Sequence, residues 1–245
     1  MSTSGSYDAF CRYYLALECA SPSRSLERCT LLELAGDLSG RDVVDIACRD
    51  GWCGRQLLAA GARSALGIDI STSMIAEGRA RSACEGDRMA FLHADVKDVE
   101  LDDEFDIVTG AWLLCLAKTR NELAAMYAQA RRLLRPGGCF IAVVNNPHYR
   151  HIGRADPATY AQVLDCVSGE GHQRMRIQFG AREDAVVVDY NWDTASHEAA
   201  AELAGFHEFV WMWPKVTPDL RAKHPAGFWN EYETNCARAF LRVRC

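Results

Sequence analysis

The chain has 245 residues, of which 49% are hydrophobic and 24% are charged, and its formal net charge is −6 at pH 7. This length suits one domain with a sizeable core, and the acidic balance argues against a broad nucleic-acid-binding face. The eleven cysteines are scattered without C-x-x-C spacing, and no apolar run is long enough to span a bilayer. We therefore expect a cytoplasmic protein with no disulfide framework, no bound metal and no membrane or nucleic-acid partner.

The first 36 residues are predicted to form a helical cap, with helices over 7–19 and 23–35. A buried strand (43–46), a tight turn, a helix (52–60) and a second buried strand (65–70) follow. This order is a βαβ unit, which in a parallel sheet leaves a ligand crevice at the carboxyl ends of its strands.

The rest of the chain continues the alternation of strands and helices. Strands are expected at 89–94, 105–109, 139–144, 208–213 and 238–244, and helices at 72–83, 120–132 and 194–204. Between them, residues 172–180 and 184–192 alternate as a β-hairpin, which we interpret as a lid over the crevice. The prediction is one domain: a cap (1–36), a cofactor-binding core (37–146), a lid or substrate insertion (147–193) and the end of the sheet (194–245).

Asp69 closes the second strand of the βαβ unit, at the spacing where an acid accepts hydrogen bonds from both ribose hydroxyls. The preceding turn, 47–51, reads A-C-R-D-G and carries one of the three glycines that a dinucleotide fold uses to approach a pyrophosphate. Asp50 at the helix start would also repel a phosphate. S-adenosylmethionine contains a ribose and no phosphate, so it fits this turn better than a dinucleotide does.

Five segments in order resemble the motifs of class I S-adenosylmethionine-dependent methyltransferases. They are D-I-A-C-R-D-G, G-I-D-I-S-x-x-M-I, H-A-D-V, F-D-I-V-T-G-A-W and L-L-R-P-G-G-C-F-I-A, which together cover residues 45–144. The resemblance implies a Rossmann-like α/β fold with a seven-stranded, mostly parallel sheet and helices on both faces. Ala47 and Arg49 depart from the family's glycines. We expect the Arg49 side chain to point away from the cofactor, because it would otherwise collide with the amino-acid moiety.

By this resemblance, S-adenosylmethionine binds and leaves as S-adenosylhomocysteine. Asp95, at the end of the third strand, is expected to accept the adenine amino hydrogens, although an aspartate there also suits a turn. The cofactor contacts implied are Tyr14, Ala47, Cys48, Gly51, Asp69, Ile70, Met74, Asp95, Val96, Gly110 and Ala111.

Three further segments, W-L-L-C-L-A, N-N-P and F-W-N-E-Y, resemble the methyltransferases of toxoflavin biosynthesis, which methylate ring nitrogens of an azapteridine. This resemblance implies a small heteroaromatic acceptor and a monomer or weak homodimer. Methyl transfer to an acidic ring N–H needs alignment and water exclusion more than a base. O-methylation of a phenol or carboxylic acid, with His148 as a base, and cofactor binding without catalysis are the alternatives. The expected substrate contacts are Tyr7, Trp112, Asn145, Tyr190, Trp192 and Trp229.

Overall fold

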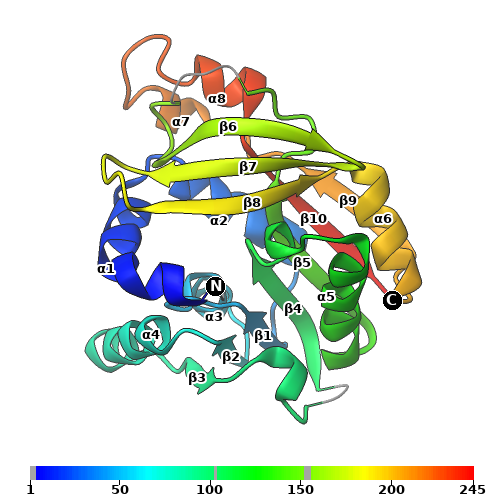
Figure 1. The fold of residues 1–245 in the computed structure, drawn as a ribbon. Coiled ribbons are helices and arrows are strands. Elements are labelled where there is room, and N and C mark those ends of the chain that lie inside the picture. The colour runs from blue at the N-terminus through cyan, green and yellow to red at the C-terminus, as the bar shows by residue number, and fades with distance from the viewer. Residues whose placement is uncertain (1–3, 102–103, 152–155) are drawn as a thin grey trace.

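The computed structural model describes residues 4–101, 104–151 and 156–245, with side chains from residue 8 onward. Its main feature is a seven-stranded sheet in the order β3-β2-β1-β4-β5-β10-β9 (Figure 1). The strands β1 to β5 are parallel to one another, whereas β10 is antiparallel to both β5 and β9. The bounds are β1 (Asp42–Ile46), β2 (Ser64–Asp69), β3 (Ala90–His93), β4 (Phe105–Ala111), β5 (Leu134–Asn145), β9 (Glu208–Met212) and β10 (Arg238–Arg244). The predicted Rossmann-like sheet is confirmed.

Both faces of this sheet are covered by helices, which explains why the central strands are apolar on both sides. All five residues of β1 are buried, and successive side chains belong to different cores. Val44 and Ile46 join the core under α5 (Arg120–Leu133) and α6 (Thr194–Leu203), whereas Val43 joins the core under α2 (Arg24–Ala35) and α3 (Trp52–Ala59).

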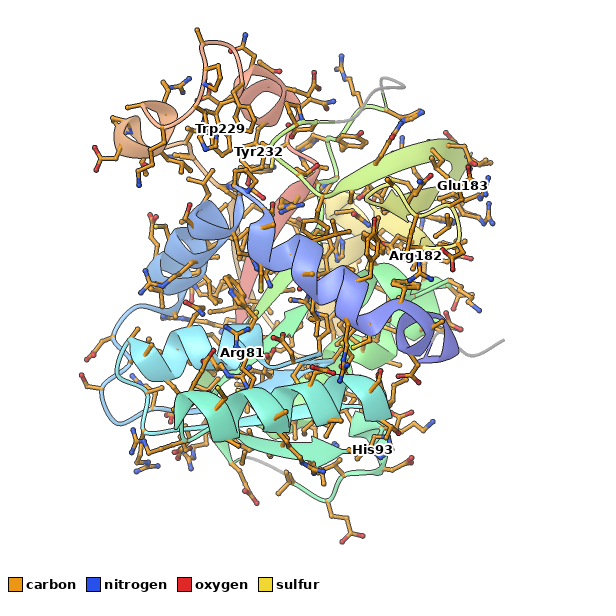
Figure 2. All side chains as sticks on the ribbon, turned by 90° about the vertical axis from the view of Figure 1, so that its left-hand side faces the viewer. Arg81, His93, Arg182, Glu183, Trp229 and Tyr232 are labelled. Carbon is orange, nitrogen blue, oxygen red and sulfur yellow. The ribbon has the colours of Figure 1, made fainter. Side chains whose placement is uncertain are left out.

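The strand order reverses between β1 and β4, so their carboxyl ends diverge and leave a crevice there. Helix α1 (Ser4–Ala20) lies between α4 (Thr72–Glu85) and the smaller sheet, as Figure 2 shows. The short elements are η1 (Val96–Asp98), η2 (Leu114–Leu116), α7 (Pro218–Arg221) and α8 (Asn230–Asn235). Within the described ranges, no helix combines the length and hydropathy needed to cross a bilayer.

The predicted hairpin lid is a three-stranded antiparallel sheet, β6-β7-β8, and the third strand corrects the prediction. It consists of β6 (Ala161–Gly169), β7 (His172–Phe179) and β8 (Val186–Trp192), and lies above the larger sheet in Figure 1. The pairing of β6 with β7 shifts register between Val163 and Asp165. Such a bulge breaks the two-residue alternation that identifies a strand in a sequence, so β6 was missed.

Gly51 begins α3 in the left-handed region, with φ +86°, and a Cβ there would lie 2.7 Å from Met89 Sδ and 2.8 Å from the Phe91 ring. Gly86, after α4, has a similar backbone (φ +69°) but open space around it. We expect Gly86→Ala to destabilise the fold by about 1–2 kcal/mol through backbone strain alone. Gly51→Ala should lose a further amount of about 1–3 kcal/mol, because the core must shift. Urea unfolding checks this, and equal losses would contradict the close packing.

Candidate functional site

A cavity of about 640 Å³ occupies the crevice at the carboxyl ends of β1, β2 and β4. Ala47 follows β1, Asp69 ends β2, and Ala111 and Trp112 lie at the end of β4 and just after it, while Tyr14 of α1 forms part of the wall. The volume is in the range of pockets that enclose a whole small ligand or cofactor.

The turn after β1 has the positive φ angles that favour glycine, although residues 47 and 49 are not glycines. Ala47 and Arg49 have φ values of +54° and +56°, and Gly51 has +86°. The left-handed region disfavours residues with a Cβ by about 1–2 kcal/mol each, so the surrounding structure must hold two of these residues in place. The substitutions at 47 and 49 therefore leave the course of the turn intact.

Asp69 lies at the edge of the cavity with each carboxylate oxygen already accepting one backbone hydrogen bond. Oδ2 accepts from Arg49 N at 2.8 Å and Oδ1 from Ser71 N at 2.8 Å. A carboxylate oxygen has a second lone pair, so both oxygens keep capacity for ligand hydroxyls. Burial raises the pKa of Asp69 above its usual range, although the two backbone donors oppose this.

Asp95 also lines the cavity and takes the turn role that was the alternative to adenine binding. Its Oδ1 accepts from Lys97 N at 3.2 Å and so caps η1, while Oδ2 pairs with Lys97 Nζ at 2.9 Å. The side chain is 39% exposed, which leaves it accessible to a ligand at this end of the crevice.

Eight of the eleven predicted cofactor contacts line the cavity: Tyr14, Ala47, Asp69, Ile70, Met74, Asp95, Val96 and Ala111. Cys48, Gly51 and Gly110 do not line it. The Cys48 thiol packs over Gly67, and Gly110 lets the Phe140 ring approach, because a Cβ there would lie 3.0 Å from it. The prediction missed the far wall, which Leu113, Leu116 and Met126 supply.

A second, smaller cavity of about 60 Å³ lies beyond the first, between the main sheet and the β6-β7-β8 sheet. Tyr14 and Trp112 line both cavities. Trp112 has φ +64°, and its backbone N–H donates to Val143 O at 2.9 Å, which fixes the residue at the exit of β4. These two aromatic side chains therefore separate a large crevice from a small inner cavity.

Comparison with known proteins supports this geometry. The family model described as "Methyltransferase domain" matches residues 43–138. The chain is 35% identical over 103 residues to a demethylmenaquinone methyltransferase of Clavibacter sepedonicus, covering 41% of this chain and 40% of that protein. It is 28% identical over 131 residues to a protein of Mycolicibacterium smegmatis named probable S-adenosylmethionine-dependent methyltransferase, covering 51% of this chain and 46% of that protein. This chain thus spans less than half the length of these two relatives.

Over almost its whole length, the chain resembles a solved S-adenosylmethionine-dependent methyltransferase of Mesorhizobium loti. The TM-score is 0.62 at 19% identity, covering 93% of this chain and all of the other. The fold is that of the class I S-adenosylmethionine-dependent methyltransferases. Within this methyltransferase fold, the large cavity occupies the crevice where the resemblance places the cofactor.

The residues that were predicted to contact the substrate lie in different environments. Trp112 and Asn145 line the inner cavity. His148 lines neither cavity and its ring stacks on Trp213 with centroids 6.0 Å apart, so nothing places it as a base. The side chain of Tyr7 lies outside the described residues.

The side chains of Tyr190, Trp192 and Trp229, which are the other three predicted substrate contacts, pack elsewhere and line neither cavity. Trp192 is 2% exposed and donates to Ala117 O at 2.9 Å, and Tyr190 packs against the same core. Trp229 is 1% exposed beside Tyr232, and Figure 2 shows both at the end of the molecule that carries α8, away from α4. Burial of a large aromatic surface and a role in binding leave the same sequence signal.

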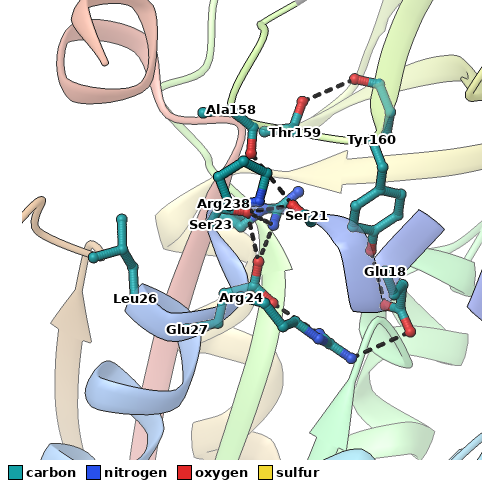
Figure 3. Close-up of polar contacts among 12 residues, drawn as sticks. Glu18, Ser21, Ser23, Arg24, Leu26, Glu27, Ala158, Thr159, Tyr160 and Arg238 are labelled. Carbon is teal, nitrogen blue, oxygen red and sulfur yellow. Dashed lines mark hydrogen bonds and ion pairs between the residues drawn. The ribbon is translucent and has the colours of Figure 1, made fainter. Parts of the chain in front are cut away.

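A buried chain of alternating charges connects the turn, the cap and the last strand of the sheet. Arg49 pairs with Glu18, Glu18 with Arg24, Arg24 with Glu27, and Glu27 with Arg238. Figure 3 draws most of this network, in which the Tyr160 hydroxyl also donates to Glu18 at 2.8 Å. Arg24 is half-buried, and its guanidinium stacks over Trp52 at 3.8 Å from the ring centroid.

The Arg49 guanidinium is directed to α1, where it also donates to the Tyr14 hydroxyl at 2.9 Å. Residue 49 nevertheless borders the large cavity, and its Nε has no partner among the described residues. Burial alone would raise the pKa of Glu18, but Arg24 and Arg49 outweigh it and hold the pKa at about 2. Glu18 is thus ionised at neutral pH, and it lies between the cap and the crevice.

The role of Asp69 can be tested with S-adenosylhomocysteine. We expect Asp69→Ala to weaken its binding by about 1.5–3 kcal/mol, because charge-assisted hydrogen bonds to the ribose are lost. Asp98→Ala is the control, since Asp98 is exposed near the crevice but does not line it. Calorimetry measures both affinities, and an unchanged affinity in Asp69→Ala would remove the ribose assignment.

The ion pair between Arg49 and Glu18 can be tested by a double-mutant cycle. Arg49→Met and Glu18→Gln should each destabilise the fold by about 3 kcal/mol or more, because each leaves a buried charge short of a partner. The double variant should recover part of the loss, with a coupling of about 0.5–3 kcal/mol. Arg12→Met and Glu77→Gln form the control cycle, because Arg12 is 87% exposed and such pairs contribute little.

Urea unfolding at several pH values adds the sign of the effect. The folded-state pKa of Glu18, about 2, lies below its ordinary value of 4.5, so its contribution is present above pH 4.5 and is lost as the pH falls toward 2. Glu18→Gln should therefore flatten the loss of stability in acid. Zero coupling at pH 7 would show that the pair adds nothing.

Proposed function

We propose that this protein binds S-adenosylmethionine in the large cavity and transfers its methyl group to a small planar metabolite, with a ring nitrogen of an azapteridine as the acceptor. The observation that carries the proposal is the junction of the two cavities at Tyr14 and Trp112. A methyl group has to pass from one bound molecule to another across a short distance, and this junction is where two ligands would meet.

The residues of the large cavity suit this cofactor. Asp69 offers two carboxylate oxygens for the ribose hydroxyls, and Asp95 offers oxygens for the adenine amino group at the other end. Met74 is 1% exposed and Val96 is half-buried, and both supply apolar contact for a flat base. The turn at 47–49 leaves the backbone close to the cavity without a phosphate-binding glycine cluster.

The cofactor, when bound, supplies a methyl group on a sulfonium, which is already a good leaving group. The protein then contributes alignment and water exclusion. Trp112 stands beside both ligands and offers a flat face to a cation, which offsets the loss of water around it. Tyr14, which is 2% exposed, seals the same junction from the α1 side.

Two alternatives have less support. O-methylation of a phenol benefits from a base, and His148 is stacked against Trp213 away from both cavities. A protein that binds the cofactor without catalysis was suggested by Arg49, but the backbone at residue 49 keeps the positive φ of the glycine that it replaces. A protein that only binds the cofactor would also not need the second, inner cavity.

The proposal is tested by methyl transfer to a panel of azapteridines, phenols and carboxylic acids at fixed cofactor. Trp112→Ala should lower turnover on an azapteridine by more than it lowers affinity for S-adenosylhomocysteine, because stacking contributes about 0.5–1.5 kcal/mol and water is no longer excluded. Trp213→Ala is the control, since Trp213 is 36% exposed and lines neither cavity. Methyl transfer to phenols or acids alone would replace the proposal by O-methylation.

A further inference from the structure

The inner cavity ends in a buried carboxyl group whose second oxygen has no partner. Asp189 of β8 lines the cavity and is 5% exposed. Its Oδ2 accepts from Asn145 Nδ2 at 3.3 Å, while its Oδ1 has no hydrogen-bond partner among the described residues. Buried polar atoms are nearly always satisfied, so an unpaired carboxylate oxygen on a cavity wall indicates a missing ligand or water.

The backbone explains why Asp189 faces inward. Val187, Asp189 and Asn191 are buried at alternate positions of β8, so they share the face that packs toward the main sheet. The Cys115 thiol interacts with the Asp189 carboxyl, but it is a weak donor and its Sγ donates to Trp112 O at 3.0 Å, so Oδ1 keeps capacity for a stronger donor. Asp189 therefore faces the same inner cavity as Trp112.

The charges around the cavity favour a donor and disfavour an anion. Asp156, Asp189 and Glu231 all line it, and three carboxylates would repel a fourth. Arg238 also lines it, and its Nη1 is bonded to Glu27 and, at 2.9 Å, to Ser23 Oγ, while its Nε has no partner among the described residues. A group that carries N–H donors, neutral or cationic, would satisfy Asp189 Oδ1, whereas a carboxylate would face it at close range.

The size of the cavity limits what enters it. A volume of about 60 Å³ holds a few water molecules or a small planar group, so one edge of the acceptor would fill it while the reacting atom stays at the Trp112 junction. The walls beside that edge are aromatic, from Tyr149 and Tyr160.

We propose that Asp189 anchors the methyl acceptor by accepting a hydrogen bond from an N–H group on its edge, so that the acceptor class is an N–H-bearing heterocycle or amine-type compound and excludes carboxylic acids. This inference rests on the proposed function, since it identifies the acceptor end of the same site. The residue is a specificity determinant that touches the acceptor.

The test uses two planar fragments of equal size, acetamidinium and acetate, which differ in charge and in N–H donors. Each is titrated into protein saturated with S-adenosylhomocysteine, and binding is followed by NMR shifts of the Asn145 side-chain amide and the Trp112 indole N–H. The pH is 8, because burial raises the pKa of Asp189 to about 6 and the group is then ionised. We expect acetamidinium to bind at least tenfold more tightly than acetate.

The variant Asp189→Asn keeps the shape and removes the charge, and it should reduce this preference to less than threefold. Asp165→Asn is the matched control, because Asp165 belongs to the same small sheet, is 42% exposed, pairs with Arg176 and does not line the cavity. It should leave the preference unchanged. A parent protein that binds acetamidinium no more tightly than acetate overturns the inference, as does a preference that survives in Asp189→Asn.

Failure of the proposed function would look different. S-adenosylhomocysteine would then not bind the parent in calorimetry, and the fragment preference would still be measured on the protein alone. Binding of S-adenosylhomocysteine without any fragment preference would refute the anchoring role of Asp189 and leave the cofactor assignment intact.

Discussion

The chain of ion pairs Arg49–Glu18–Arg24–Glu27–Arg238 is the constraint on which the site depends. It joins three segments of the protein that are separated in the sequence. Glu18, Glu27, Arg49 and Arg238 are buried and Arg24 is half-buried, and a buried charge is tolerated only with a partner of opposite sign and good hydrogen bonds. The turn after β1, the two cap helices and strand β10 must therefore come together in one arrangement. Hydrophobic packing alone would hold the cap against the sheet without fixing its position this narrowly.

This arrangement positions the aromatic junction. Glu18 also accepts from Tyr14 at 3.0 Å, so the network that holds Arg49 orients the tyrosine that lines both cavities. At its other end, the Arg238 guanidinium lies 5.6 Å from the centroid of the Trp112 ring. The two aromatic walls of the junction are thus attached to opposite ends of one ionic chain. A change in the cap would therefore reach the junction of the two cavities without altering a residue that lines either one.

Local sequence signals predicted the main sheet and most of the lining of the large cavity. Such signals suffice because a strand, and an acid at its end such as Asp69, can be recognised from neighbouring residues. Signals of that kind could not reveal the partner of Arg49, since Glu18 lies 31 positions earlier in the chain. They also could not show that Trp192 and Trp229 are core or that Asp189 faces a cavity. Those outcomes depend on how β8 and the last segments dock onto the sheet, and a bulge in β6 concealed that the lid has a third strand.

Backbone strain gives the last link between fold and site. Among the described residues, those other than glycine with positive φ are Ala47, Arg49 and Trp112, and all three line the large cavity. Each conformation costs about 1–3 kcal/mol and persists only where the surroundings enforce it. The ion pair to Glu18 enforces it at Arg49, and the hydrogen bond to Val143 O enforces it at Trp112. These contacts therefore fix the backbone at Arg49 and Trp112, where it shapes the wall of the crevice.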